Sequence, residues 1–120
     1  MVKILKNLLP NPLRLKDMEE AITRTYNCII NKELIAVFGD YDVDGASSTA
    51  LLTRYFLLIN QKIQTYIPDR HTEGYGPNIN SFNKLINNKV KIIFTVDCGT
   101  SAFEPIKLAQ KSNVDRKSVV

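Results

Sequence analysis

The segment that decides the fold is Leu34-Ile35-Ala36-Val37-Phe38-Gly39-Asp40-Tyr41-Asp42-Val43-Asp44-Gly45. Its first five residues form a continuous apolar run of strand length, which is typical of a buried parallel strand. Three carboxylates at alternate positions follow, and residues 46–59 then have a helical apolar pattern. The side chains expected on the packed side of this helix are Leu51, Leu52, Tyr55, Leu58 and Ile59. A strand that runs through an acidic loop into a helix predicts an α/β domain.

The rest of the chain continues this alternation. The further predicted elements are a strand at 62–67, a loop at 68–77, a short helix at 80–86, a strand at 90–96 and a helix at 103–111. Strands that alternate with helices predict a Rossmann-like, partial doubly wound parallel sheet of about three strands, with right-handed crossovers. A helix from about residue 17 precedes the sheet, and its apolar face is formed by Met18, Ile22, Tyr26 and Ile29.

Three units are expected along the chain: an extended segment and helix at 1–33, the α/β unit at 34–114, and a tail at 115–120. The tail, Asp115-Arg116-Lys117-Ser118-Val119-Val120, matches a translation of a common sequencing-library adaptor read in one frame to its stop codon. We therefore expect the native sequence to end at Val114 and the tail to be non-native. Finding the codons of residues 115–120 in uninterrupted genomic context would contradict this expectation.

Composition limits the function only broadly. A chain of 120 residues is one small domain or a piece of a larger one. Its net charge of +4 fits a polyanionic partner without establishing one. Two distant cysteines, Cys28 and Cys98, indicate neither a disulfide framework nor a zinc site. No apolar run approaches the roughly 20 residues needed to cross a bilayer. We expect a cytoplasmic protein with no membrane partner.

The acidic loop is the most informative feature for chemistry. Packing Asp40, Asp42 and Asp44 together is unfavourable unless a cation neutralises them. Hard divalent ions such as Mg²⁺ or Mn²⁺ prefer such oxygen ligands. Because glycine tolerates unusual backbone angles, Gly39 and Gly45 are expected to let the loop curl around an ion.

Three other interpretations of this loop remain open. In a calcium EF-hand, Asp40, Asp42, Asp44 and Gly45 would match positions 1, 3, 5 and 6, but Leu51 stands where the bidentate glutamate belongs. A haloacid-dehalogenase-like phosphatase would use Asp42 as nucleophile and Asp44 as acid/base, although Ala46 replaces its usual threonine. A purely structural turn would use Asp44 to cap the following helix, a role that needs one aspartate and not three.

A second carboxylate, Asp97, follows the strand predicted at 90–96. An isolated aspartate at the end of a strand is often a turn former or a helix cap. If the strand order is 2-1-3, however, Asp42, Asp44 and Asp97 emerge from neighbouring strand ends into one crevice, where doubly wound sheets bind ligands. Carboxylates from two loops meeting there are what a metal-activated hydroxide requires.

The loop at 68–77 supplies the candidate substrate-binding residues Arg70, Tyr75 and Gly76. An arginine is suited to a bidentate grip on phosphate, and a tyrosine is suited to stacking on a base. The alternative is an ordinary loop, in which Gly74 and Gly76 permit a turn and Asp69 pairs with Arg70 at the surface. His71 is interpreted as a surface residue, and Cys98 as a small buried neighbour of Asp97.

These segments together resemble a known family. Asp40–Ala50, Asp97–Ser101 and Arg70–Gly76 are similar to three motifs of the RecJ branch of the DHH phosphoesterases. The resemblance implies a two-ion, Mn²⁺- or Mg²⁺-dependent exonuclease that hydrolyses single-stranded DNA from its 5′ end to mononucleotides during recombination and repair. It also implies a helicase and a single-strand-binding protein as partners.

Carried over by position, the resemblance makes Asp42, Asp44 and Asp97 the metal ligands, with Asp97 as the candidate bridge. Asp40 joins them in the catalytic set, where it orients the loop or a metal-bound water. Two departures matter: Phe38 stands where related enzymes carry a histidine ligand, and the Asp-His-His motif expected just past Val114 is missing. We therefore predict an incomplete site and an inactive fragment. The alternatives are a phosphatase and a non-catalytic metal- or nucleic-acid-binding module.

Overall fold

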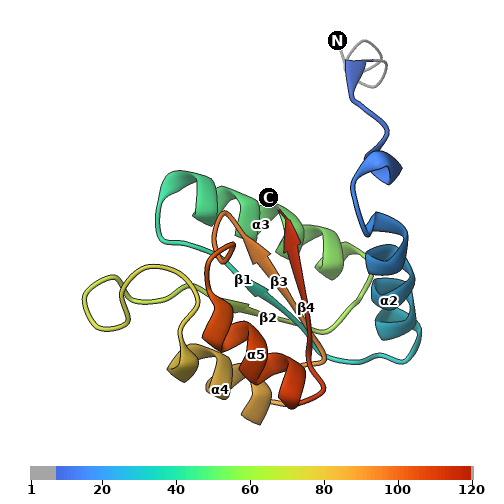
Figure 1. Ribbon diagram of the computed structural model, residues 1–120. Helices are drawn as coiled ribbons and strands as arrows, with labels where there is room; N and C mark the ends of the chain where they lie inside the picture. The colour runs from blue at the N-terminus through green and yellow to red at the C-terminus, as the bar shows by residue number, and fades with distance from the viewer. Residues whose placement is uncertain (1–7, 120) are drawn as a thin grey trace.

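The fold is a parallel sheet with helices on both faces (Figure 1). The structure is a computed structural model that describes residues 8–119, with side chains described as far as Asp115. Its four strands are β1 (Ile35–Phe38), β2 (Ile63–Tyr66), β3 (Ile92–Val96) and β4 (Asp115–Val119), in the order β2-β1-β3-β4. Phe38 pairs with Tyr66 on one side and with Thr95 on the other. The predicted α/β class is therefore confirmed, and the structure has the 2-1-3 order on which the shared crevice depends.

The helices form two layers. After a short 3-10 turn, η1 (Pro12–Arg14), come α2 (Met18–Ile30), α3 (Val43–Leu58), α4 (Ile79–Asn87) and α5 (Phe103–Lys111). Figure 1 shows α2 and α3 against one face of the sheet, and α4 and α5 against the other. No helix among the described residues has the length and apolar character required to cross a membrane.

Side chains of β1 alternate between two cores. Ile35 and Val37 pack with residues of α2 and α3, whereas Ala36 and Phe38 pack with residues of α4 and α5. All four positions are fully buried, because each face of the strand is covered by a helical layer. This double burial explains why the sequence shows a continuous apolar run there instead of an alternating pattern.

The packed side predicted for α3 is wrong. The buried residues of α3 are Gly45, Thr49 and Phe56, whereas Leu51, Tyr55, Leu58 and Ile59 are exposed and Leu52 is half-buried. Small residues face the sheet near the start of the helix because the chain that leaves β1 passes very close to it. Leu51, Tyr55 and Leu58 therefore turn outward, whereas Phe56 packs in the core and Leu52 against it.

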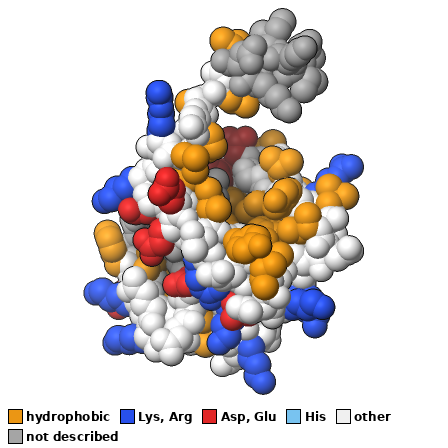
Figure 2. Space-filling view, turned by 90° about the vertical axis from the view of Figure 1, so that its right-hand side faces the viewer, with side chains coloured by type: hydrophobic (Ala, Val, Ile, Leu, Met, Phe, Trp, Pro, Cys, Tyr) orange, Lys and Arg blue, Asp and Glu red, His pale blue; other side chains and the backbone are white. Residues whose placement is uncertain are grey.

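A groove of about 340 Å³ lies between α2 and α3, and Ile22, Tyr26, Tyr55 and Phe94 are among its lining residues. Figure 2 shows hydrophobic side chains gathered on this face. The residues predicted to form the apolar face of α2 do lie together along this groove. Ile22 and Tyr26 are exposed there and not buried.

The fourth strand occupies most of the predicted tail. Backbone bonds pair β4 in parallel with β3, from Ile92–Asp115 to Val96–Val119. At its start, Asp115 and Glu33 both accept hydrogen bonds from Arg24 on α2. Because a parallel ladder is built from backbone groups, this pairing does not test where residues 115–120 come from. The non-native tail stays a prediction; residues 1–7 and 120 of the predicted units lie outside the described residues.

Candidate metal centre

The β1–α3 loop places its aspartates at the carboxyl edge of the sheet. Asp42 has extended backbone angles and caps α3, because its Oδ1 accepts a hydrogen bond of 2.8 Å from the Gly45 N–H. The interpretation as a purely structural turn named Asp44 as the helix cap, and that assignment is wrong because the cap is Asp42. Asp44 lies exposed in the first turn of the helix, where the helix dipole favours a negative charge.

Gly39 and Gly45 make this loop possible through close packing. Neither has a positive φ, so the expectation that they supply unusual backbone angles is wrong. A Cβ at Gly45 would lie 2.7 Å from the Cβ, N and O atoms of Asp40, and a Cβ at Gly39 would overlap the Thr49 hydroxyl. The loop folds back onto α3 closely enough that only glycine fits at both positions.

Asp40 is the buried member of the group. Its side chain is 1% exposed, and its Oδ1 has no hydrogen-bond partner in the structure. A buried carboxylate oxygen without a donor is costly, and such atoms call for a bound ion or water. An orphaned anionic oxygen beside two other aspartates is an environment that suits a cation.

Asp97 approaches these residues from the end of β3. Its backbone is left-handed, with φ of 56°, which directs the chain sharply away from the strand. Although the side chain is exposed, partial desolvation raises the pKa of Asp97, and the negative charges of Asp42 and Asp44 and a side-chain hydrogen bond with Asp42 raise it further. The structure thus brings together the carboxylates predicted to share one crevice.

These carboxylates form only part of an ion site. Within residues 8–119, no three carboxylate, imidazole or thiol side chains are placed so that they alone could hold a metal ion. Phe38, at the position of a histidine in related enzymes, is fully buried in the core and stacks on Tyr66 with ring centroids 5.4 Å apart. Its side chain serves packing.

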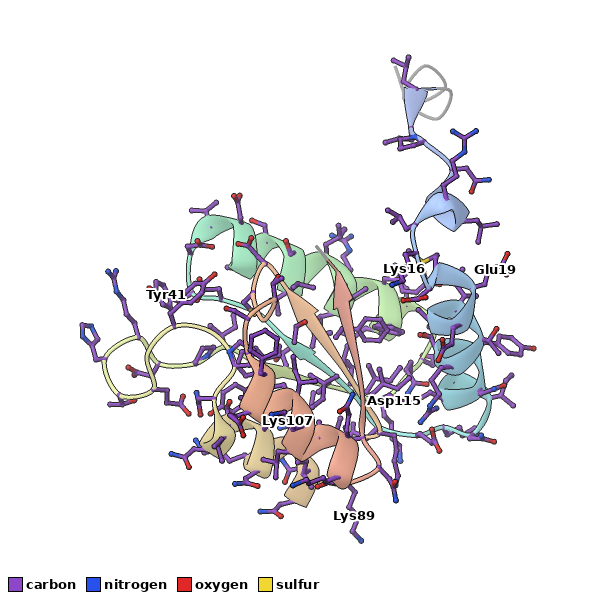
Figure 3. All side chains as sticks on the ribbon, in the orientation of Figure 1. Lys16, Glu19, Tyr41, Lys89, Lys107 and Asp115 are labelled. Atoms are coloured by element: carbon purple, nitrogen blue, oxygen red, sulfur yellow. The ribbon has the colours of Figure 1, made fainter. Side chains whose placement is uncertain are left out.

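The 68–77 loop covers the same edge. The Arg70 guanidinium lies 5.1 Å from the centre of the Tyr41 ring, and Figure 3 shows Tyr41 beside this loop. The Tyr75 hydroxyl donates to the Asp97 carbonyl oxygen at 3.3 Å. Gly76 is buried next to Cys98 with φ of 72°. The three candidate substrate-binding residues therefore all lie near the aspartates.

Asp69 and Arg70 do not form the surface ion pair considered for this loop, because each side chain has a different partner. Asp69 Oδ1 accepts from the N–H groups of His71 and Thr72 at 2.7 and 3.1 Å, which closes a tight turn. His71 is exposed, and Cys98 is buried beside Asp97, as predicted for both.

A pocket of about 440 Å³ opens beside Asp97. Its lining residues are Ser48, Tyr75, Val96, Asp97, Cys98, Gly99, Thr100 and Ser101.

Sequence reasoning missed two contributors. Tyr41 supports Arg70, and Glu73 bonds to Tyr66 and Lys84, which are far from it along the chain. No local pattern indicates partners that lie 7 and 11 residues away, in a strand and in a helix. The sequence did offer one signal for Tyr41, which stands between Asp40 and Asp42. An aromatic ring in an acidic loop is expected to stay partly exposed, and an exposed ring is available to a cation such as Arg70.

The comparisons with known proteins decide the family. The N-terminal domain of the DHH family matches residues 34–118, which is more than half of the chain. The chain belongs to the DHH family. This membership sets aside the EF-hand and haloacid-dehalogenase interpretations of the acidic loop. Strand β1, which stands before the aspartates where an EF-hand has a helix, is a second argument against the EF-hand.

Several relatives of this DHH chain are named as nucleases. It is 36% identical over 105 residues to the single-stranded-DNA-specific exonuclease RecJ of Bacillus subtilis, covering 88% of this chain and 13% of that protein. With RecJ of Escherichia coli it shares 30% identity over 110 residues, covering 91% and 19%. A crystal structure of exonuclease RecJ bound to manganese superposes with a TM-score of 0.80 at 29% identity, covering 92% and 28%.

RecJ of Thermus thermophilus in complex with Mn²⁺ superposes with a TM-score of 0.74 at 22% identity, covering 92% and 15%, which supports the fold alone. The chain spans less than a third of the length of each of these four proteins.

Proposed function

We propose that this chain is part of a metal-dependent 5′–3′ exonuclease that hydrolyses single-stranded DNA to mononucleotides in recombination and repair. The observation that carries the proposal is the approach of Asp97 to Asp42 and Asp44 at the carboxyl edge of adjacent strands, in a chain of the DHH family. The relatives named as single-stranded-DNA-specific exonucleases support the substrate.

The residues present fit a Mn²⁺ or Mg²⁺ ion. The donors are all carboxylate oxygens, and the buried Asp40 Oδ1 has no hydrogen-bond donor among the described residues. Asp42, Asp44 and Asp97 would supply part of the ion's ligands, and Asp40 would orient the loop. A divalent ion supplies charge stabilisation and an activated water to phosphodiester hydrolysis.

The chain's own residues would handle the DNA. Arg70 presents a guanidinium that suits a phosphate, and Tyr75 is 67% exposed, with its ring available to stack on a base. Gly76 has the positive φ that turns the loop over Cys98. A basic chain of net charge +4 would also be drawn to the polyanion.

We further propose that the 120-residue chain is inactive by itself. The described residues hold no complete set of ion ligands, and affinity depends on ligand count and geometry. The complete enzyme would work in the cytoplasm with a helicase and a single-strand-binding protein. If the chain instead acts alone, as a module that binds metal or nucleic acid, binding without hydrolysis would remain.

The test uses the full-length product of the gene, the 120-residue chain, and Asp97→Asn in each. With Mn²⁺ and a 3′-labelled single-stranded oligonucleotide, the full-length protein should release mononucleotides and the Asp97→Asn protein should lose roughly a hundredfold or more in rate. The 120-residue chain should leave the oligonucleotide intact. A full-length protein that is inert, or one that is unaffected by Asp97→Asn, would overturn the proposal.

A further inference from the structure

Glu73 is the most fully bonded side chain of the 68–77 loop. Its Oε1 accepts from the Tyr66 hydroxyl and from the Lys84 ammonium at 3.2 Å, and its Oε2 accepts from the Asp69 N–H at 3.0 Å. The side chain is only 18% exposed. Both carboxylate oxygens are therefore used, by donors that belong to three different segments, and hydrogen bonds to a charged group are the stronger kind.

The two donors to Glu73 that lie outside the loop belong to regular secondary structure. Tyr66 is the last residue of β2, and its ring stacks on the fully buried Phe38. Lys84 belongs to α4, and its ammonium also reaches the Tyr66 hydroxyl at 3.0 Å. We call Tyr66, Glu73 and Lys84 the loop anchor. It ties a loop without regular structure to a strand end and to a helix.

The loop anchor lies between the two contacts that the loop makes with the aspartate region. On one side, the Glu73 N–H bonds to the Asp69 carbonyl at 2.8 Å and closes the turn that carries Arg70 over Tyr41. On the other side, Gly74 and Gly76 have positive φ and turn the chain back, so that the Tyr75 hydroxyl reaches Asp97.

We propose that Glu73 is a positioning residue, which through the loop anchor holds Arg70 and Tyr75 over the aspartates and so sets where a DNA end meets the metal site. This inference rests on the proposed function. The hydrogen bonds of the loop anchor join its own three residues and Asp69, and they do not involve Asp42, Asp44 or Asp97. Loss of the loop anchor should therefore displace the loop and leave the carboxylates in place.

The experiment compares Glu73→Ala, Tyr66→Phe and a matched control, Glu104→Ala, in the 120-residue chain by NMR. Tyr66→Phe keeps the ring on Phe38 and removes only the hydroxyl, so it tests the loop anchor if Glu73→Ala fails to fold. Glu104→Ala removes a different Lys–Glu pair, the exposed one that Glu104 makes with Lys107 within α5. The readout is the ring-current shift that Tyr41 imposes on the Arg70 side-chain protons.

The expected result is loss of the Arg70 shift in Glu73→Ala, a reduced shift in Tyr66→Phe, and no change in Glu104→Ala. Dispersed core signals should persist in all three, which a merely destabilised protein would not show. An Arg70 shift that stays at its wild-type value in both Glu73→Ala and Tyr66→Phe would overturn the proposal.

Added Mn²⁺ separates this proposal from the proposed function. Bound Mn²⁺ should broaden the ring signals of Tyr41 and Tyr75 and spare those of Tyr26 and Tyr55, which lie on α2 and α3 beside the apolar groove. In Glu73→Ala the Tyr41 broadening should remain and the Tyr75 broadening should be lost. Equal broadening of Tyr75 in both proteins would overturn the role of the loop anchor. Because the chain holds only part of the ion's ligands, Mn²⁺ is added at a concentration high enough to load a partial site. No selective broadening of Tyr41 and Tyr75 in the wild type would then contradict the metal site and leave the loop anchor untouched.

Discussion

Replacing Gly45 by alanine should destabilise the protein, although the same change in most helices has the opposite effect. Gly45 lies in the first turn of α3 with an ordinary negative φ, so alanine meets no backbone strain there. On helix propensity alone, alanine would stabilise by about 1 kcal/mol. The obstacle is steric, because the new Cβ would lie 2.7 Å from the Cβ, N and O atoms of Asp40.

The size of the effect follows from what those three atoms are. Two of them belong to the backbone of a buried loop and cannot rotate away, so relief requires the loop to move from the helix. Overpacking of this kind costs about 1–3 kcal/mol, and we place Gly45→Ala near the upper end. After the propensity gain is subtracted, a net loss of about 1–2 kcal/mol remains.

The measurement is urea unfolding of Gly45→Ala beside Ser47→Ala, a control at an exposed position of the same helix. Ser47→Ala should be neutral or slightly stabilising, since it changes propensity without a clash. Gly45→Ala should also weaken Mn²⁺ binding, detected by electron paramagnetic resonance, because Asp40 and Asp42 are displaced together. A Gly45→Ala protein as stable as the wild type would refute the argument from close packing.

Three further results are expected. Asp42→Asn should keep the helix cap and the stability of the chain while losing Mn²⁺ binding, whereas Asp42→Ala should also lose about 1 kcal/mol of unfolding free energy; equal stability of the two variants in thermal melts would contradict the cap. Hydrogen bonds from Tyr66 and from the Asp69 N–H lower the pKa of Glu73, so its ionised form stabilises the folded chain above pH 4.5, the ordinary value, and this contribution is lost as pH falls through the lowered pKa. The destabilisation caused by Glu73→Gln, measured in urea, should therefore shrink at acidic pH, and a pH-independent difference would count against it. Burial raises the pKa of the Cys28 thiol to about 11, so that at pH 8 only about one thiol in a thousand is ionised; mass spectrometry should find Cys28 unmodified by iodoacetamide until the chain unfolds, and rapid labelling of the folded chain would speak against this burial.

Much of the sheet could be predicted because its signals are local. The apolar run of β1, the β-branched run of β3 and the aspartate that follows each of them are visible in the sequence. The 2-1-3 order is one of the common orders of doubly wound sheets, and the structure has it. The convergence of Asp97 with Asp42 and Asp44 then depends only on adjacent parallel strands ending at one edge.

The orientation of α3 could not be predicted in the same way. Hydrophobic periodicity points toward Leu51, Tyr55 and Leu58, but the sheet is met by Gly45 and Thr49, whose small size carries no hydrophobic signal. The orientation of α3 is decided by the close approach of the β1–α3 loop to the helix at Gly45. This tertiary contact cannot be read from the local sequence pattern. The same proximity assigns the cap to Asp42, since its carboxylate reaches the Gly45 N–H.

The left-handed backbone at Asp97 has a consequence for engineering. A residue with a side chain is disfavoured at this φ, glycine is at ease there, and asparagine tolerates it while shedding the charge that opposes Asp42 and Asp44. Selection for heat resistance alone would therefore drift toward glycine or asparagine at this position. Thermal stability and metal binding therefore favour different residues at position 97. Selection for stability alone would remove the proposed metal ligand while the fold stayed intact.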